Sequence, residues 1–349
     1  MAIACQISLT AAMMRGGEGT DMTTASTSTI RWAIIGAGRI TATTAPDLLA
    51  IDGFEVRTIM TRTPGAGDEL AALCGATTTT SLDDVLADPL VDAVYIATPF
   101  VSHAQIAREC LLAGKHVVIE KPIATSAADA EELFALATAQ NCFLMEGMWM
   151  KFNPVYERIV QLVQAGAIGE PRSVRAGFGF PRPNDGSGRW DVKRSGSTLL
   201  DQGIYLATLD HLMFGMPDAL SGRADIREDG LDLAGHFTLE HTGGQFTHGA
   251  YSMVDFVDPS AAISGTEGWI VVPGMFWAAQ ALRIHRGDWD GLFVNPEQIE
   301  LPWEGFGYRP MFTAVRDALR DGLLQHPRHD ERATVEVIRT LEQIRAAST

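Results

Sequence analysis

The chain has 349 residues, enough for two domains of ordinary size, and its 46% hydrophobic and 20% charged residues are typical of a globular protein. A formal net charge of -16 disfavours nucleic acid and anionic membranes as partners, because both are polyanions, and requires a local positive patch wherever an anionic cofactor binds. No run approaches the ~18 apolar residues of a membrane span. The four cysteines form no Cys-x-x-Cys pair, so we expect idle thiols in a reducing compartment and a cytoplasmic location.

The segment before the first predicted strand has no pattern of regular structure. Residues 20–29 are a Thr/Ser-rich run without periodicity, which is typical of disorder. No positive charge precedes the mildly apolar residues 1–14, so a secretion signal is not indicated. We therefore predict a disordered extension over residues 1–29, with Met22 as an alternative start of translation.

Strand-like and helix-like segments alternate from residue 30 to residue 146. Short apolar runs predict strands at 31–35, 54–60, 77–80, 91–97, 116–119 and 142–146. Helices are predicted at 41–50, 68–74, 82–87, 103–113 and 126–139, with Ser81 as the cap of the third. This alternation is typical of a doubly wound parallel sheet, so the predicted fold class is α/β, and residues 30–148 are expected to form a dinucleotide-binding Rossmann domain.

The pattern changes beyond residue 148. Strands separated by Gly, Asp and Pro are predicted at 172–180, 221–226, 235–241, 245–253, 261–265, 268–272, 281–286 and 298–301, and helices at 154–165, 197–214, 308–321 and 331–346. Successive strands with short turns predict a large, open, mostly antiparallel sheet with one face covered by helices. Residues 149–349 are thus expected to form an α+β domain for substrate binding and oligomerisation, whose final helix can pack back on the Rossmann domain.

A glycine turn follows the first strand and opens the first helix, the context in which a Gly-x-Gly-x-x-Gly match is informative. Gly36 permits the tight turn, and Gly38 leaves space for a pyrophosphate at the helix N-terminus, beside Arg39 and Ile40. Thr41 replaces the third small residue, so looser packing of the helix on the strand is expected. A glycine turn without a ligand is the alternative.

The end of the second strand bears on cofactor choice. An NAD enzyme places Asp or Glu there to bind the ribose 2′-hydroxyl, whereas this chain has Thr61-Arg62-Thr63. No carboxylate repels a 2′-phosphate, and Arg62 can pair with it while Thr61 supplies a hydroxyl. We therefore predict that NADP is preferred over NAD. The alternative is that Arg62 is an exposed loop arginine.

Ordered motifs in the first half of the chain carry a family resemblance. They are Asp-Ala-Val-Tyr-Ile-Ala-Thr-Pro at 92–99, His103, and Gly-Lys-His-Val-Val-Ile-Glu-Lys-Pro at 114–122. With these motifs the chain resembles the glucose-fructose oxidoreductase/inositol dehydrogenase/MocA (Gfo/Idh/MocA) family over residues 30–345. A further stretch, Glu-Gly-Met-Trp-Met-Lys-Phe-Asn-Pro at 146–154, is similar to the subgroup that contains dimeric dihydrodiol dehydrogenase and NADP-dependent D-xylose dehydrogenase.

The resemblance implies a set of residues around the dinucleotide. These are Thr98, Pro99, His103, Glu120, Lys121 and Pro122. His103 is expected to cap its helix and to lie near the cofactor, and Pro122 to fix the backbone so that Lys121 points into the crevice. The histidines of the chain show no metal-ligand spacing, so no metal site is expected.

Lys121 is the first candidate catalytic residue. In the resembled family this lysine contacts the nicotinamide ribose and the substrate oxygen. An ammonium group there stabilises the alkoxide that forms as hydride leaves carbon, and it lowers the pKa of an acidic partner. The alternative is a surface lysine that is ion-paired to Glu120.

The proton acceptor is expected within residues 199–205. Where most of the family has a histidine, this chain has Tyr205, as in the dihydrodiol dehydrogenase subgroup. Asp201 and Tyr205 are four residues apart, so both are predicted to project from one face of a helix. The phenol pKa near 10 must be lowered by a cation such as Lys121 before Tyr205 can act as acid or base. Asp201 is expected to bind substrate hydroxyls or to orient Lys121, and packing is the alternative role for both.

Aromatic residues are candidates for substrate contacts. Trp149, Phe178 and Phe180 are expected to form an apolar wall against a sugar or diol, and in the resembled subgroup the tryptophan lines the substrate pocket. Aromatic side chains are more often part of a core, which is the alternative.

These features predict an NADP-preferring dehydrogenase or reductase. It would transfer a hydride between the nicotinamide and a hydroxyl or carbonyl of a sugar, a cyclic polyol or a vicinal diol. Two other functions are compatible with the fold. One is a glycosidase-like enzyme that keeps NAD(H) tightly bound and oxidises the sugar transiently, and the other is a non-catalytic, nucleotide-sensing regulator.

Nine apolar or aromatic residues of the second sheet suggest an interface between copies of the chain. Alternate residues of a strand share a face, and this is more apolar surface than a monomer usually exposes. They are Phe237, Leu239, Phe246, Tyr251, Met253, Trp269, Val271, Phe276 and Trp277. We expect a homodimer or a higher homo-oligomer through this sheet, as in the resembled family.

Overall fold

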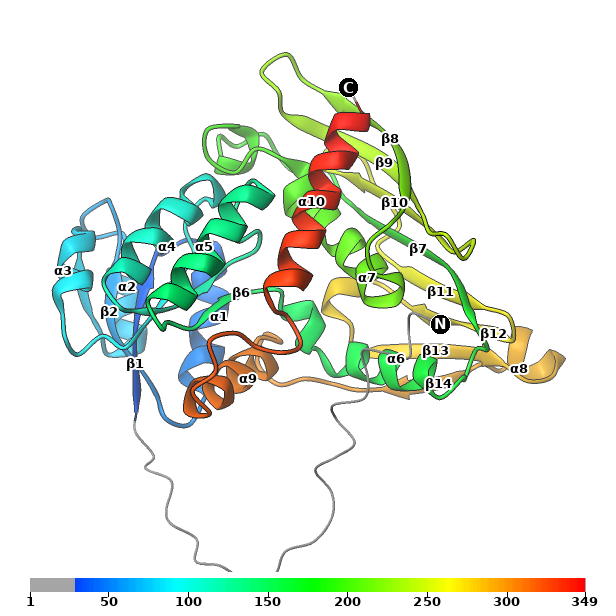
Figure 1. Cartoon of the computed structure of the whole chain (residues 1–349), viewed down its shortest axis with the longest axis horizontal. Helices are drawn as coiled ribbons and strands as arrows, with labels where there is room; N and C mark the ends of the chain where they lie inside the picture. The colour runs from blue at the N-terminus through cyan, green and yellow to red at the C-terminus, as the bar shows by residue number, and fades with distance from the viewer. Residues whose placement is uncertain (1–28, 349) are drawn as a thin grey trace, which may run out of the picture.

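The computed structural model describes residues 29–348. The predicted extension over residues 1–29 and the alternative start at Met22 lie outside the described residues, apart from Thr29. Two β-sheets carry the fold, and Figure 1 shows them side by side, with helix α10 (Glu331–Ala347) lying between α5 (Ala127–Ala139) and the larger sheet. A parallel sheet and a mostly antiparallel sheet confirm the predicted α/β fold class.

The smaller sheet is parallel throughout, in the order β3-β2-β1-β4-β5-β6. Its strands are β1 (Ile30–Ile35), β2 (Phe54–Met60), β3 (Thr77–Thr79), β4 (Ala93–Ile96), β5 (His116–Ile119) and β6 (Leu144–Glu146). The helices between them are α1 (Arg39–Leu49), α2 (Asp68–Cys74), α3 (Leu82–Ala87), α4 (His103–Leu112) and α5. The strand order reverses between β1 and β4, and doubly wound sheets bind ligands outside the carboxyl ends of the strands at such a point.

The strands of this sheet are apolar on both faces, and both faces are buried. Along β1, Trp32 and Ile34 belong to one core cluster, while Ala33 and Ile35 belong to the other, and all four are at most 1% exposed. Helices cover both faces, which is why a near-continuous apolar run is the right pattern for a parallel strand.

The larger sheet has the order β14-β13-β12-β11-β7-β10-β9-β8, in which only the β7–β10 pair is parallel. Its strands are β7 (Pro171–Gly179), β8 (Ala219–Ile226), β9 (Asp232–Glu240), β10 (Phe246–Ser252), β11 (Ala261–Gly265), β12 (Gly268–Val272), β13 (Ala281–Arg286) and β14 (Glu297–Glu300). The remaining helices are α6 (Pro154–Gln164), α7 (Ile204–Phe214), α8 (Trp289–Phe293) and α9 (Arg309–Arg320).

One face of the larger sheet is covered by the chain's own helices. Helix α7 packs on β7 and β10, and α10 packs on β8 (Figure 1). Six of the nine residues predicted for an intermolecular face are buried in the chain itself, at 0–8% exposure: Phe237, Leu239, Tyr251, Met253, Phe276 and Trp277. The prediction was wrong for these six, because their side chains belong to the core of the chain itself. Phe246, Trp269 and Val271 are half-buried and alternate with the core residues of their strands.

The bounds of the helices and strands agree with those predicted from the sequence to within a few residues, with two differences. The helix predicted at 197–214 begins with a π-helical turn, Leu199–Gly203, before α7 starts at Ile204. Helix α8 was not predicted, because five residues carry too little periodicity, although Asp288 caps it by accepting from Gly291 N at 3.1 Å.

Asp47 ties the first helix to the chain around residue 308. Its carboxylate is fully buried and accepts hydrogen bonds from the backbone N–H of Phe306 at 2.9 Å and of Tyr308 at 2.8 Å. Arg309 Nε lies 3.3 Å from the same carboxylate. The contact fixes Tyr308 relative to α1.

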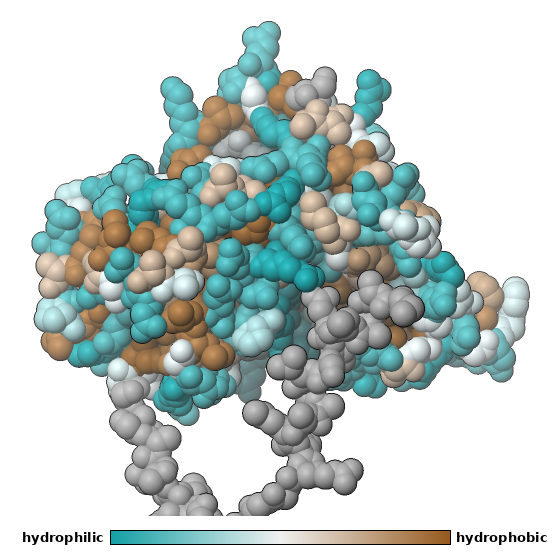
Figure 2. Space-filling model, in the orientation of Figure 1, coloured by the Kyte–Doolittle hydropathy of each residue, from teal (hydrophilic) through white to brown (hydrophobic). Residues whose placement is uncertain are grey.

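No helix within residues 29–348 is long and apolar enough to cross a bilayer. On the face seen in Figure 2, hydrophilic groups lie between the hydrophobic ones over both sheets.

Candidate active site

The glycine turn between β1 and α1 has the geometry that a phosphate group requires. Gly36 has φ +105°, and a Cβ there would meet the Ala97 carbonyl oxygen at 2.6 Å, so only glycine fits. Gly38 precedes the helix with no atom within 4 Å of where its Cβ would be, and no side chain caps the helix N-terminus. Open space in front of uncapped N–H groups fits the pyrophosphate of a dinucleotide. Arg39, at the start of the helix, is exposed, and Ile40 is half-buried.

Thr41 does not loosen the packing of α1. Its side chain is fully buried, and its hydroxyl donates to the Gly36 carbonyl oxygen at 3.0 Å. The expectation of looser packing was wrong, because the hydroxyl closes the turn instead of displacing the helix.

The loop after β2 places Arg62 in solvent. Arg62 is exposed, and no hydrogen bond or ion pair of its side chain occurs within residues 29–348, while the Thr61 hydroxyl donates to the Thr63 carbonyl oxygen at 2.9 Å. The arginine is therefore available to a ligand, and the hydroxyl of Thr61 is already in use.

His103 joins two loops and does not cap its helix. It is the first residue of α4, and Ser102, which precedes the helix, makes no capping bond either. The ring of His103 is 1% exposed, with Nδ1 2.7 Å from the Pro122 carbonyl oxygen and Nε2 2.9 Å from that of Thr98. His103 thus holds the Thr98-Pro99 loop and the Lys121-Pro122 loop together. The prediction that His103 caps its helix was wrong. Its position beside these two loops agrees with the sequence analysis.

Lys121 and Asp201 meet at the centre of the site. Lys121 Nζ lies 2.8 Å from Asp201 Oδ1 and 2.7 Å from the backbone oxygen of the same residue. The other carboxylate oxygen, Oδ2, accepts from Arg189 Nε at 2.7 Å. Burial opposes the charge of Lys121, but the Asp201 carboxylate outweighs it and raises the lysine's pKa. Burial likewise opposes the charge of Asp201, yet the two cations hold its pKa well below the usual range.

Glu120 is not the partner of Lys121. Its buried carboxylate accepts from the Tyr95 hydroxyl at 2.5 Å, and burial raises the pKa of Glu120 to about 7. The alternative of a Lys121–Glu120 surface pair is thereby replaced by the Lys121–Asp201 pair.

Tyr205 lies beside the Lys121–Asp201 pair. The turn between Asp201 and Tyr205 is partly π-helical, whereas a regular helix was predicted. Lys121 Nζ is 5.0 Å from the centre of the tyrosine ring, and the tyrosine hydroxyl accepts from Trp149 Nε1 at 3.0 Å. Burial raises the pKa of Tyr205, and the Lys121 charge opposes this only in part. The expectation that Lys121 lowers the pKa of Tyr205 below its ordinary value was therefore wrong in its net direction.

An aromatic group lines the same region. The ring of Phe178 is stacked on Trp277, with centroids 3.4 Å apart, and lies 5.9 Å from both Tyr205 and Phe180. Trp149 is stacked on Tyr308 at 4.6 Å. The predicted wall of Trp149, Phe178 and Phe180 is thus assembled around Tyr205, and Trp277 and Tyr308 extend it.

Sequence reasoning missed Arg182 and Arg189. Both lie in the segment 181–196 after β7, which has no periodic pattern and no motif at a fixed distance from Lys121. Arg194 O accepts from Val101 N at 3.2 Å, and Ser195 Oγ accepts from Phe100 N at 3.3 Å. The only signal in the sequence was a cluster of basic residues in a chain of strongly negative charge.

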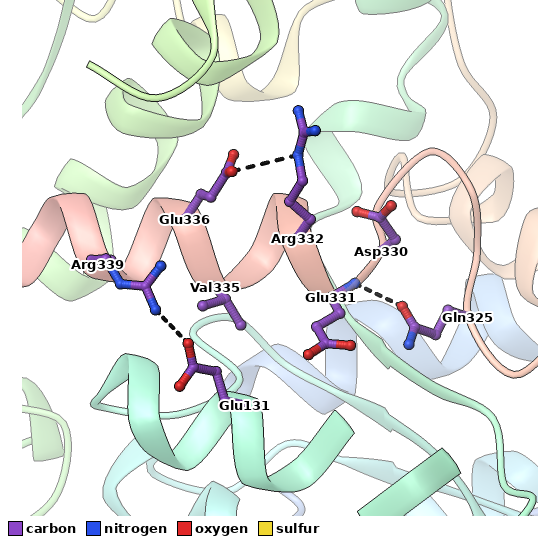
Figure 3. A pocket seen from close by; sticks show the side chains of 8 residues that line it. All are labelled: Glu131, Gln325, Asp330, Glu331, Arg332, Val335, Glu336 and Arg339. Atoms are coloured by element: carbon purple, nitrogen blue, oxygen red, sulfur yellow. Dashed lines mark hydrogen bonds and ion pairs between the residues drawn. The ribbon is translucent and has the colours of Figure 1, made fainter. Parts of the chain in front are cut away.

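A second hollow, drawn in Figure 3, lies between α5 and α10 and contains none of the predicted site residues. Its lining holds four acidic residues and two arginines, and each arginine has a carboxylate partner. Arg339 pairs with Glu131, and Arg332 pairs with Glu336 at 3.4 Å. The excess charge of this hollow is negative, so it does not favour an anion.

Known proteins with related sequences and structures are oxidoreductases. The family model for an oxidoreductase family with an NAD-binding Rossmann fold (GFO_IDH_MocA) matches residues 30–148, and the GFO/IDH/MocA C-terminal domain model matches residues 156–271. Trans-1,2-dihydrobenzene-1,2-diol dehydrogenase of Mus musculus is 32% identical over 85% of this chain and 90% of its own length.

Two reductases are also similar to this chain. The dTDP-3,4-didehydro-2,6-dideoxy-alpha-D-glucose 3-reductase of Saccharopolyspora spinosa is 32% identical over 69% of this chain and 74% of its own length. A 3-ketoreductase from Actinomadura kijaniata, crystallised with NADP and TDP-benzene, superposes with a TM-score of 0.82 at 26% identity, over 91% of this chain and 98% of that one. The chain belongs to the Gfo/Idh/MocA oxidoreductase family.

Proposed function

We propose that this chain is an NADP-dependent oxidoreductase that interconverts a hydroxyl and a carbonyl on a sugar, a cyclic polyol or a vicinal diol. The observation that carries the proposal is the position of Lys121, just beyond the carboxyl end of β5, where it pairs with Asp201 and lies over the Tyr205 ring. The similarity to dehydrogenases and reductases of diols and sugars favours net redox turnover over transient oxidation in a glycosidase and over a non-catalytic regulator.

In the proposed division of labour, residues 30–148 bind the cofactor and residues 149–349 bind the substrate and form oligomers. The turn at Gly36 and Gly38 would hold the pyrophosphate, beside Arg39 and Ile40. The loops of Thr98, Pro99, Glu120 and Pro122, braced by His103, would lie along the rest of the dinucleotide. When bound, the nicotinamide accepts or supplies the hydride.

Tyr205 is the proposed proton carrier. Its hydroxyl oxygen accepts the Trp149 N–H, so its own proton is available to a substrate oxygen. Burial keeps the pKa of Tyr205 above its ordinary value, so the hydroxyl holds its proton at neutral pH. That is the state required to protonate the oxygen in carbonyl reduction, which leaves Tyr205 as the tyrosinate. In the opposite direction the tyrosinate form of Tyr205 takes the proton from the substrate hydroxyl.

Lys121 is the proposed source of positive charge at the substrate oxygen. Asp201 keeps the lysine protonated and fixes its position, and Arg189 holds the second carboxylate oxygen so that Asp201 cannot turn away. An ammonium group fixed beforehand stabilises negative charge on oxygen without reorganising in the reaction. Trp149 and Phe178 would pack against the apolar face of the substrate.

A panel of aldoses, inositols and vicinal diols, followed at the NADPH absorbance, tests this proposal. NADPH formation with at least one member, or its consumption with the matching ketone or lactone, is the expected result. No turnover with any member in either direction, by folded protein that binds NADP, would reject the proposal.

Arg62 is proposed to select NADP over NAD. An Arg62→Ala variant is expected to weaken NADP binding by about 1.5–3 kcal/mol, the range for a charge-assisted hydrogen bond, and to leave NAD nearly unchanged. Titration of the protein with both cofactors measures this. Equal losses for both would mean that Arg62 acts elsewhere, and tighter wild-type binding of NAD would overturn the preference.

We also propose a homodimer, formed by the face of the larger sheet that helices α7 and α10 leave uncovered. Trp269 lies on that face, half-buried and stacked on His285 with centroids 4.4 Å apart. The two-fold pairing of such faces is a common way to bury an open sheet. A cytoplasmic location fits the buried, unpaired thiols of Cys110 and Cys142.

Light scattering at micromolar concentration is expected to give at least twice the chain mass of 37.7 kDa. A Trp269→Asp variant is expected to shift the population towards monomer, because a carboxylate in a paired face is desolvated without a partner. Leu112→Asp introduces the same charge at an exposed position on α4 and serves as the control. A wild-type mass of one chain would contradict the dimer.

A further inference from the structure

Arg182 and Arg189 lie close to Asp201, although the proposed hydride transfer requires only the positive charge of Lys121. A small cavity is lined by Arg182, Arg189, Ser195, Ser197, Thr198, Asp201, Gln202 and Met253. It shares Asp201 with the lysine, so whatever enters the cavity lies beside the proposed reacting groups.

Arg182 has no acceptor for its buried nitrogen. Its guanidinium lies over the Phe180 ring, 4.4 Å from the centroid, and its Nε is buried without a hydrogen-bond partner within residues 29–348. Burial, followed by the charge of Arg189, lowers the pKa of Arg182. A buried donor without an acceptor is costly in a folded protein, so this nitrogen favours an acceptor that enters the cavity.

The local charge is out of balance. Lys121, Arg182 and Arg189 supply three positive charges, and Asp201 is the one carboxylate that lines the cavity. Asp185, the further carboxylate acting on Arg189, is exposed and accepts from the backbone N–H of Ser187 at 3.0 Å. In the hollow of Figure 3, by contrast, each arginine has its own carboxylate.

We infer that Arg182 and Arg189 form a subsite for an anionic group of the substrate, a carboxylate or a phosphate. The inference rests on the proposed function and narrows its substrate class from neutral sugars and diols to acidic ones. A planar guanidinium presents paired N–H donors to such an oxyanion. Asp201 accepts from Arg189 through Nε, whereas the Arg182 side chain makes no hydrogen bond within residues 29–348 and can offer all of its donors.

A phosphate of the cofactor is a second source of the same chemistry, because the charge of Arg39 at the start of α1 reaches Arg182. The substrate is favoured, since the uncapped N-terminus behind Gly38 already offers donors for the pyrophosphate, and the cavity lies against Asp201.

Equilibrium binding to the NADPH-loaded protein tests the subsite. The probes are methyl glucoside, methyl glucuronide and methyl glucoside 6-phosphate, which have no carbonyl that NADPH can reduce under these conditions, so calorimetry records binding without turnover. At least one charged probe is expected to bind about tenfold or more tightly than the neutral one, as for a hydrogen bond to a charged group, with a difference that shrinks as salt is added. Whether the glucuronide or the 6-phosphate binds more tightly shows whether the subsite prefers a carboxylate or a phosphate.

Arg182→Gln is expected to remove that difference, and Arg182→Lys to keep part of it. Lys193→Gln, an exposed residue of the same segment, makes the same change of charge and is expected to leave the difference in place. Equal binding of neutral and charged probes, or no binding of the charged ones, would overturn the subsite. So would an Arg182→Gln variant that weakens NADPH but keeps the preference for charge, since the anion would then belong to the cofactor. Failure of the proposed function is separate: it is the absence of turnover in the sugar and diol panel, whatever the probes do.

Discussion

A Lys121→Ala variant is expected to lose about 10²-fold or more in kcat while remaining folded. The substitution removes the positive charge at the substrate oxygen, and Asp201 keeps its second partner, Arg189, so its carboxylate is not left without a cation. Steady-state kinetics with the best substrate of the panel, together with circular dichroism, measures both parts.

Tyr205→Phe tests the proton carrier in the same assay. The phenyl ring can keep the packing against Phe178 and Trp277, while the hydroxyl that accepts from Trp149 is lost, and a kcat loss of about 10²-fold or more is again expected. Tyr156→Phe is the matched control, since that buried hydroxyl donates to the Phe276 carbonyl oxygen at 2.9 Å away from the proposed reacting groups. Turnover like that of the wild type in Lys121→Ala or Tyr205→Phe would remove that residue from the mechanism.

Asp47→Ala is expected to give the largest loss of stability among these variants. Removal of the carboxylate leaves the backbone N–H groups of Phe306 and Tyr308 without their acceptor. At about 1–3 kcal/mol for each unpaired donor, the free energy of unfolding should fall by about 2–6 kcal/mol. Urea unfolding followed by tryptophan fluorescence gives the change.

Two further variants show whether the loss comes from these bonds. Asp47→Asn keeps one acceptor oxygen and is expected to recover part of the stability. Asp52→Ala deletes an exposed carboxylate just beyond α1 and is expected to change stability by at most about 0.5 kcal/mol. If Asp47→Ala unfolds like Asp52→Ala, the junction between α1 and residues 306–309 contributes little to stability.

The parallel sheet could be predicted almost entirely from the sequence, because its strands are apolar on both faces and its turns and caps use residues with local meaning. Gly36 and Ser81 are examples, since a positive φ and a helix cap depend on neighbours within a few residues. The family resemblance brought Lys121 and Tyr205 into one hypothesis, without any measure of the distance between them.

What could not be predicted depends on partners that are far apart in the chain. The net pKa direction of Tyr205 depends on how completely it is buried, and the pairing of Asp201 with Arg189 depends on the path of an aperiodic segment. The buried Phe237 and Tyr251 show the same limit for the sheet, since alternation tells which residues share a face but not which face the chain's own helices cover.

Helix α1 has one end at the glycine turn and the other near Asp47, which holds the backbone of Tyr308. Tyr308 in turn is stacked on Trp149, next to the Tyr205 hydroxyl. A rotation of the two sheets relative to each other would have to break the hydrogen bonds of Asp47. Helix α1 therefore keeps the distance between the glycine turn and the aromatic wall constant. The segment 181–196 is attached to Phe100 and Val101 by only two hydrogen bonds, so we expect it to move before the Asp47 contact does when a ligand enters.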